Sequence, residues 1–221
     1  MKKLSSLVLI LSMSLSSLLM ASSGGSDLPK ISIDPLNRTE SLQNGAKLFI
    51  NYCLGCHSAK YVRYGRIAQD LDISIADLKA NLMFTSNKVG DPLTIALTPE
   101  LAKEWFGASP PDLSLEARLR GPDWVYGYLT GFYPDENRPY GYNNHVFPSV
   151  GMPHVMEGMQ KELSEVEFNK QMYDLTNFMD YMAEPMKKER IELGRWVIAF
   201  LVFLFLPVTI WLNHEYWKDI H

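Results

Sequence analysis

Apolar residues recur at helical spacing along most of the chain, and two further stretches near the ends are apolar almost throughout. Leu42, Ala46 and Phe49 share one helical face, and Thr39 offers an oxygen that can cap a helix start. The pattern therefore predicts a helix that leads into Cys53.

Capping and stop residues predict further helices. Ser74 begins a short helix that ends near Phe84, and Thr98-Pro99 begins another that stops at Gly107. Residues 122–130 form an aromatic-rich helix, and Ser164 opens a long one with an apolar stripe. Strand signals are sparse, and residues 131–150, without a clear period, are expected to be a long loop. The fold class expected is mainly α with long loops.

The two ends differ in kind from the middle. A basic start, an apolar Ser-rich run and small residues predict a signal peptide over residues 1–23, against the alternative of a retained membrane helix. Residues 196–212 carry no charge and have aromatics near both ends, which predicts a transmembrane anchor over 191–213, kinked at Pro207. A buried core helix is the alternative, but no polar face is visible. Residues 24–190 would be the exported domain and 214–221 a short cytoplasmic tail.

The charge distribution tests these assignments. Basic residues precede the anchor, so the positive-inside rule alone would keep the large domain in the cytoplasm. We follow the signal peptide instead, because long domains are translocated largely regardless of charge. The formal charge of −4 falls by two, to −6, when Lys2 and Lys3 leave with the signal. An acidic domain argues against nucleic acid as a partner.

The chemistry is concentrated in Cys53-Leu54-Gly55-Cys56-His57. Two cysteines three apart followed by a histidine are the attachment signal of a c-type haem, with His57 as the proximal iron ligand. A dithiol redox pair, half a zinc site and a plain disulfide are the alternatives. The chain has two cysteines in all, so a zinc site lacks further thiols and only one haem can be attached this way.

The other face of such a haem is closed by Met or His in electron carriers and stays open in haem proteins that bind small molecules. Met152 lies between Gly151 and Pro153 in a stiff loop, whereas Met172, Met179, Met182 and Met186 fit core packing better. His145 and His154 on the same loop are rival ligands, although a lone loop histidine is more often solvated.

Several segments resemble the cytochrome c1 family, the haem subunit of the quinol–cytochrome c reductase (cytochrome bc1 complex), and its proteobacterial branch most. The matching segments are CLGCHSAKYVRYGRIAQDL at 53–71, PPDLS at 110–114, RLRG at 118–121, VFPSVGMPHVM at 146–156 and the C-terminal anchor. The resemblance implies a cytochrome c-like haem domain with long loops and insertions, plus one C-terminal transmembrane helix.

The resemblance also assigns residues. Cys53 and Cys56 would hold the haem covalently, and His57 and Met152 would be its axial ligands. Arg120 would pair with a haem propionate, with Arg118 as a weaker rival. Pro110 and Pro111 would pack beside the haem edge and Tyr126 in its pocket. Glu116 stands where an apolar residue is expected. From hydrophobicity we further expect burial of the haem by aromatic side chains: Trp105, Phe106, Phe132 and Phe147.

The function implied is one-electron transfer from the Rieske iron–sulfur subunit to a c-type cytochrome, within a dimeric complex that also contains cytochrome b and oxidises a quinol such as ubiquinol. Alone the chain would be an electron carrier, catalytic only as a subunit. It would lie in the inner membrane with its haem domain in the periplasm and its C-terminus in the cytoplasm. An independent membrane-anchored cytochrome c that serves a terminal oxidase, and a haem enzyme or gas sensor with an open distal face, are the alternatives.

Overall fold

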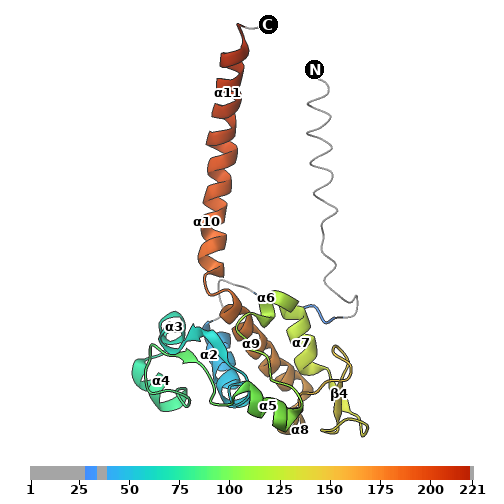
Figure 1. Ribbon diagram of the computed structural model, residues 1–221. Coiled ribbons are helices and arrows are strands. Elements are labelled where there is room, and N and C mark those ends of the chain that lie inside the picture. Colours follow the sequence, from blue (N-terminus) through green and yellow to red (C-terminus); the bar gives the residue numbers. More distant parts are fainter. Residues whose placement is uncertain (1–27, 34–38, 220–221) are drawn as a thin grey trace.

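The computed structural model describes residues 28–33 and 39–219, which form a helical domain and one long projecting helix (Figure 1). The predicted signal peptide, residues 1–23, lies outside the described residues. The elements are α2 Thr39–Leu48, a π-helical turn η2 Phe49–Cys53, β1 Ala59–Arg63, α3 Tyr64–Asp70, α4 Ile75–Asn81, β2 Pro92–Leu93, α5 Pro99–Phe106, α6 Glu116–Arg120, α7 Pro122–Thr130, β3 Phe132–Pro134, β4 Tyr142–Asn144, α8 Glu157–Glu162, α9 Glu165–Ala183, α10 Lys187–Phe200, a second π-helical turn η3 Leu201–Phe205 and α11 Leu206–Trp217. The mainly α class expected from the sequence is confirmed.

The domain is built on the crossing of α2 and α9. Gly45 permits the close approach, because a Cβ at this position would lie 2.1 Å from the Asp174 carbonyl oxygen. Phe49 and Phe178 pack beside the crossing with ring centroids 5.7 Å apart, and both are fully buried. This crossing makes a rigid base for the segment that follows α2, which carries both cysteines.

A buried carboxylate is satisfied within the same interface. Asp174, 2% exposed, accepts hydrogen bonds from Ser41 Oγ at 2.6 Å, Asn44 Nδ2 at 2.8 Å and Lys170 Nζ at 3.0 Å. A buried charge is tolerated only when it is paired in this way. The network therefore fixes the register of α2 on α9.

Local capping explains the helix ends. Ser164 forms the predicted capping box with Glu167, and Thr98 caps α5, which stops at Gly107 with a φ of +76°. Ser74 caps α4 as expected, but α4 ends at Asn81 rather than near Phe84. These starts depend on neighbouring residues, so they could be predicted from the sequence.

The segment 131–150 is not a featureless loop. It contains an antiparallel hairpin in which Phe132 pairs with Asn144 and Pro134 with Tyr142. A second two-stranded sheet, β1 with β2, was also not foreseen. β2, β3 and β4 have two or three residues each, too few to give a period, and β1 has five, so the sequence pattern did not reveal these pairings.

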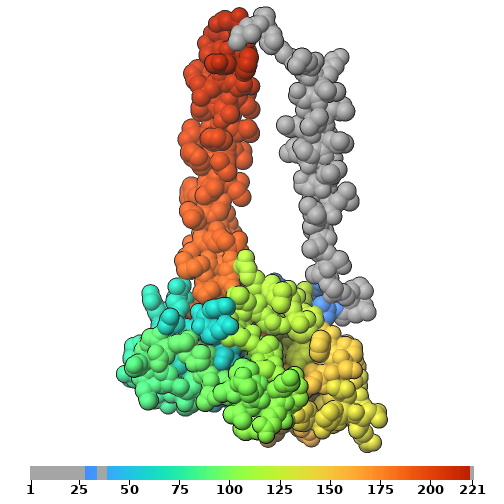
Figure 2. All heavy atoms as spheres, viewed as in Figure 1, coloured from blue at the N-terminus to red at the C-terminus, as the bar shows by residue number. Residues whose placement is uncertain are grey.

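The C-terminal helix projects from the domain (Figure 2). Residues Lys187–Trp217 form the one helix among the described residues that is long and apolar enough to cross a membrane, with a mean hydropathy of 2.2 in its most apolar window. It encloses the predicted anchor 191–213. Pro207 has no backbone N–H and cannot donate a helical hydrogen bond. Just before it the hydrogen-bond pattern changes from α to π in the turn η3, where Leu206 N donates to Leu201 O. Figure 1 shows a continuous helix through this turn.

Candidate haem-binding site

Cys53 and Cys56 lie on the tight turn that ends the first helix. The π-helical turn closes with Leu54 N donating to Phe49 O, and both Cys56 N and His57 N donate to Cys53 O, at 3.1 and 2.9 Å. Both cysteines are free thiols, Cys53 buried and Cys56 exposed. Burial raises the pKa of Cys53 to about 12, which keeps it a neutral thiol. The turn thus presents two thiols and an imidazole within five residues.

His57 is oriented by a backbone carbonyl. Its Nδ1 lies 2.8 Å from Pro111 O, so the hydrogen bond fixes the tautomer with the proton on Nδ1 and a free lone pair on Nε2. Burial lowers the pKa of His57, although the Pro111 carbonyl opposes this, so the ring is neutral at pH 7. A neutral imidazole with one nitrogen held and the other free is the form that binds a metal.

The segment that contains Pro110 and Pro111 is clamped onto β1. Asp112 accepts hydrogen bonds from Lys60 N at 3.0 Å and from Ser114 N at 2.9 Å. Ser114, fully buried, in turn accepts one from Tyr61 N. These bonds place the Pro111 carbonyl beside His57, so the predicted PPDLS motif and the cysteine turn meet in space.

Arg120 lies between α6, α7 and the loop that contains Met152. Its Nε donates to Glu116 Oε1 at 2.6 Å, which explains the acid at a position where an apolar residue was expected. Its guanidinium sits 4.3 Å from the Trp124 ring centroid and 5.9 Å from that of Phe147. Arg118 instead pairs with Glu184 at 3.0 Å, near the foot of the anchor. Of the two arginines, Arg120 is the one among the aromatic side chains, and its role toward a propionate stays a prediction.

Met152 contacts a tyrosine that the sequence reasoning missed. The Tyr128 hydroxyl donates to Met152 Sδ at 3.3 Å, and burial raises the pKa of Tyr128 to about 12 despite the nearby Arg120 charge. Tyr126, the predicted pocket residue, is partly buried against the hydrophobic core of the domain. Trp124 and Tyr128 stand four residues apart on α7 and stack at 5.2 Å, and this i, i+4 spacing was the signal available in the sequence.

The β3–β4 hairpin holds the loop before Met152. Arg138 donates from one terminal nitrogen to Ser149 O and Val150 O, both at 2.7 Å. Asn143 Oδ1 accepts from Ser149 N at 2.9 Å. Ser149 has a φ of +64°, which bends the loop at this residue. Asn144 Oδ1 accepts from Val146 N at 2.9 Å and from Phe147 N at 3.1 Å. The chain reaching Met152 is therefore held at several backbone groups.

The rival histidines have other roles. His154 was expected to be solvated, but it is 7% exposed, its Nε2 lies 2.6 Å from Gln160 Oε1, and it stacks on Phe132 at 4.6 Å. His145 stacks on Tyr133 at 4.3 Å. With Nε2 of His154 engaged and its ring covered, His154 is less available as a ligand, and Met152 as the ligand on this loop stays a prediction.

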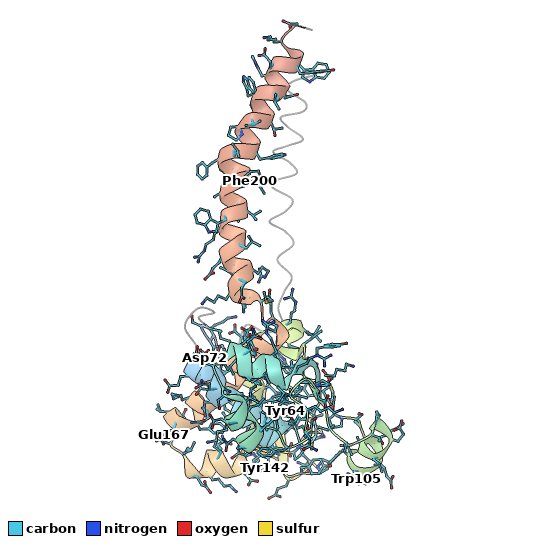
Figure 3. All side chains as sticks on the ribbon, turned by 90° about the vertical axis from the view of Figure 1, so that its left-hand side faces the viewer. Tyr64, Asp72, Trp105, Tyr142, Glu167 and Phe200 are labelled. Carbon is cyan, nitrogen blue, oxygen red and sulfur yellow. The ribbon has the colours of Figure 1, made fainter. Side chains whose placement is uncertain are left out.

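The aromatic residues expected to bury a haem differ in how exposed they are. Phe132 is 7% exposed, but Phe147 is 46% exposed and Trp105 is 62% exposed. Figure 3 shows Trp105 at the tip of α5, pointing away from the domain. Trp105 and Phe106 contact each other edge to face. The burial of the haem by Trp105 stays a prediction.

The donor set fits a covalently attached haem. Two free thiols three residues apart match the two vinyl groups of a porphyrin, and a tautomer-fixed imidazole follows at once. The zinc alternative has no support, since no group of three or more His, Cys, Asp or Glu side chains among residues 28–33 and 39–219 could hold a metal ion.

Comparisons with known proteins agree with this chemistry. Residues 36–220 match the model of the Cytochrome C1 family. Cytochrome c1 of Allochromatium vinosum is 45% identical over 92% of this chain and 93% of its own length. The ammonia monooxygenase gamma subunit of Nitrosomonas europaea is 40% identical over 91% and 93%, respectively. Cytochrome b/c1 of Bradyrhizobium diazoefficiens is 26% identical over 82% of this chain and 33% of its own length.

Proposed function

Because the chain belongs to the cytochrome c1 family, and so is a haem-bearing, membrane-anchored electron-transfer subunit of the cytochrome bc1 complex, we propose that it accepts one electron from the Rieske iron–sulfur subunit and passes it to a c-type cytochrome. The observation that carries the proposal is His57, whose Nδ1 is held by the Pro111 carbonyl so that Nε2 is free beside two thiols.

Each predicted residue has a role in this proposal. Cys53 and Cys56 would hold one haem c covalently, and His57 Nε2 and Met152 Sδ would bind its iron. When bound, the haem supplies one iron that changes its charge by a single electron. Arg120 would pair with a propionate, and its charge would compensate that carboxylate. Pro110, Pro111 and Tyr126 line the pocket wall.

The chain's own residues keep the electron site rigid. His57 is fixed by the clamped 110–114 segment, and Met152 is fixed by the hairpin. Because neither His57 nor Met152 has to move, the site needs little structural reorganisation when it gains or loses an electron. Methionine ligation also favours the reduced form and raises the potential. These properties suit a carrier that passes electrons onward.

The partners are proposed from the complex. Cytochrome b is expected beside the anchor, and the Bradyrhizobium diazoefficiens relative is named cytochrome b/c1. The Rieske subunit is the donor, and the complex is a dimer. The haem domain lies in the periplasm and the C-terminus in the cytoplasm of an inner membrane.

One purification tests the proposal. The chain is tagged at its C-terminus, extracted in mild detergent, and its companions are identified by mass spectrometry. We expect a di-haem cytochrome b, a Rieske protein and quinol–cytochrome c reductase activity. Recovery of oxidase subunits would favour an independent cytochrome. Recovery of monooxygenase subunits would favour the role named for the Nitrosomonas europaea relative.

Orientation is tested separately. A reporter that folds only in the cytoplasm, fused after His221, should be active, and one placed before residue 39 should be inactive. The opposite result would reverse the proposed topology.

A further inference from the structure

The Tyr128 hydroxyl and the Met152 sulfur are joined by a hydrogen bond of 3.3 Å. We propose that Tyr128 is a positioning residue of the electron-transfer site, which orients the Met152 thioether and raises the reduction potential. The inference rests on the proposed function, and in particular on Met152 as an axial ligand.

The phenol ring of Tyr128 is fixed on two sides. Trp124 stacks on it with centroids 5.2 Å apart and an interplanar angle of 10°, and Phe132 meets it edge to face at 5.3 Å. The backbone is fixed as well, because Asn144 Nδ2 donates to Tyr128 O at 2.8 Å. With ring and backbone held, the hydroxyl has a set direction toward the sulfur.

The same contacts connect α7 with the loop that contains Met152. Asn144 belongs to β4 and holds both Tyr128 O and the amide groups of Val146 and Phe147. A movement of the loop relative to α7 would break the Tyr128–Met152 bond and the Asn144 bonds together. The Tyr128–Met152 bond and the Asn144 bonds therefore both locate the sulfur relative to α7.

The chemistry of a thioether predicts in which direction this hydrogen bond shifts the reduction potential. Sulfur has two lone pairs and is a weak acceptor, so one lone pair can accept the hydrogen bond from the Tyr128 hydroxyl while the other faces a metal. The hydrogen bond draws electron density from the sulfur. A less electron-rich ligand stabilises the more positive metal charge less, so the bond favours the reduced form. Removing the hydroxyl should lower the potential.

The test is Tyr128→Phe in the full haem-loaded chain, purified in detergent. Phenylalanine retains the ring that stacks on Trp124, so the thermal midpoint should change little. At a fixed potential the ratio of reduced to oxidised protein should fall on the order of threefold. For a one-electron couple at 59 mV per tenfold, this is about 30 mV. The far-red absorption band of sulfur-ligated oxidised haem should also shift.

A matched control removes a tyrosine hydroxyl elsewhere. Tyr173 donates to Ser32 O at 2.9 Å, away from Met152, so Tyr173→Phe should leave the potential and the far-red band unchanged. An equal shift in both variants would overturn the proposal, since a general change in the domain would then explain it.

Met152→Leu separates this inference from the proposed function. Loss of the far-red band in Met152→Leu, together with a lowered potential in Tyr128→Phe, supports both. If Met152→Leu loses the band while Tyr128→Phe leaves potential and band unaltered, only the role of Tyr128 is overturned. Retention of the band in Met152→Leu would overturn the ligand assignment and this inference with it.

Discussion

Asn144 is the polar residue whose removal should most loosen the loop leading to Met152. Its side chain is 1% exposed, and its Oδ1 accepts from Val146 N at 2.9 Å and Phe147 N at 3.1 Å. Its Nδ2 donates to Tyr128 O at 2.8 Å. Asn144→Ala therefore leaves two donors and one acceptor without these partners.

The magnitude follows from those three bonds. Each hydrogen bond contributes about 1 kcal/mol net, and a buried group left unpaired costs about 1–3 kcal/mol. Water can enter the space of the lost amide and satisfy part of the deficit. Asn144→Ala should thus reduce the free energy of unfolding by about 2–4 kcal/mol.

Guanidinium unfolding of the full chain in detergent, followed by near-ultraviolet circular dichroism, measures this loss. Asn137→Ala is the matched control, because Asn137 is exposed and its bonds run to Asp135 within the hairpin turn. It should cost under about 0.5 kcal/mol. A loss below about 1 kcal/mol for Asn144→Ala would show that the hairpin does not hold the loop.

Three further changes test the scaffold. Gly45→Ala places a Cβ 2.1 Å from Asp174 O, so α2 and α9 must separate, and thermal scans should show a loss above about 3 kcal/mol or no folded protein. Ser164→Ala removes the cap of α9 and should cost about 1 kcal/mol in guanidinium unfolding, whereas Ser164→Asp should retain most of the stability. The hydrogen bond from Arg190 lowers the pKa of Glu184 below its usual 4.5, so the folded state binds this proton less readily than the unfolded state. That stability is present above pH 4.5 and lost as the pH falls through the lower folded pKa, so an acid titration should separate wild type from Glu184→Gln at neutral pH and bring them together once the pH is below that folded pKa.

The sequence predicted elements whose signals are local. Thr98, Gly107 and Ser164 cap or stop helices through contacts within four residues, so their positions could be read directly. The cysteine turn was equally local. The apolar C-terminal run likewise needs no partner in the chain to be recognised.

The missed features depend on contacts between distant segments. The β3–β4 hairpin has three-residue strands joined by seven residues, and it is held by bonds to the following loop. The sequence predicted Tyr126 for the pocket and did not single out Tyr128, because an aromatic-rich helix shows little amphipathic contrast. Only the packing of Trp124 against Tyr128, and of Tyr128 against Met152, distinguishes the two faces.

The two proposed ligands are held by different means, and this difference has a consequence. His57 follows a helix that is pinned by the α2–α9 crossing, and its ring is oriented by one carbonyl. Met152 lies on a loop whose order comes from side chains of a separate hairpin. Local opening is governed by the weakest set of contacts, so the Met152 loop should open at a lower free energy than the cysteine turn. Exchange of the axial ligand is therefore expected on the Met152 side, and the hairpin sets its rate.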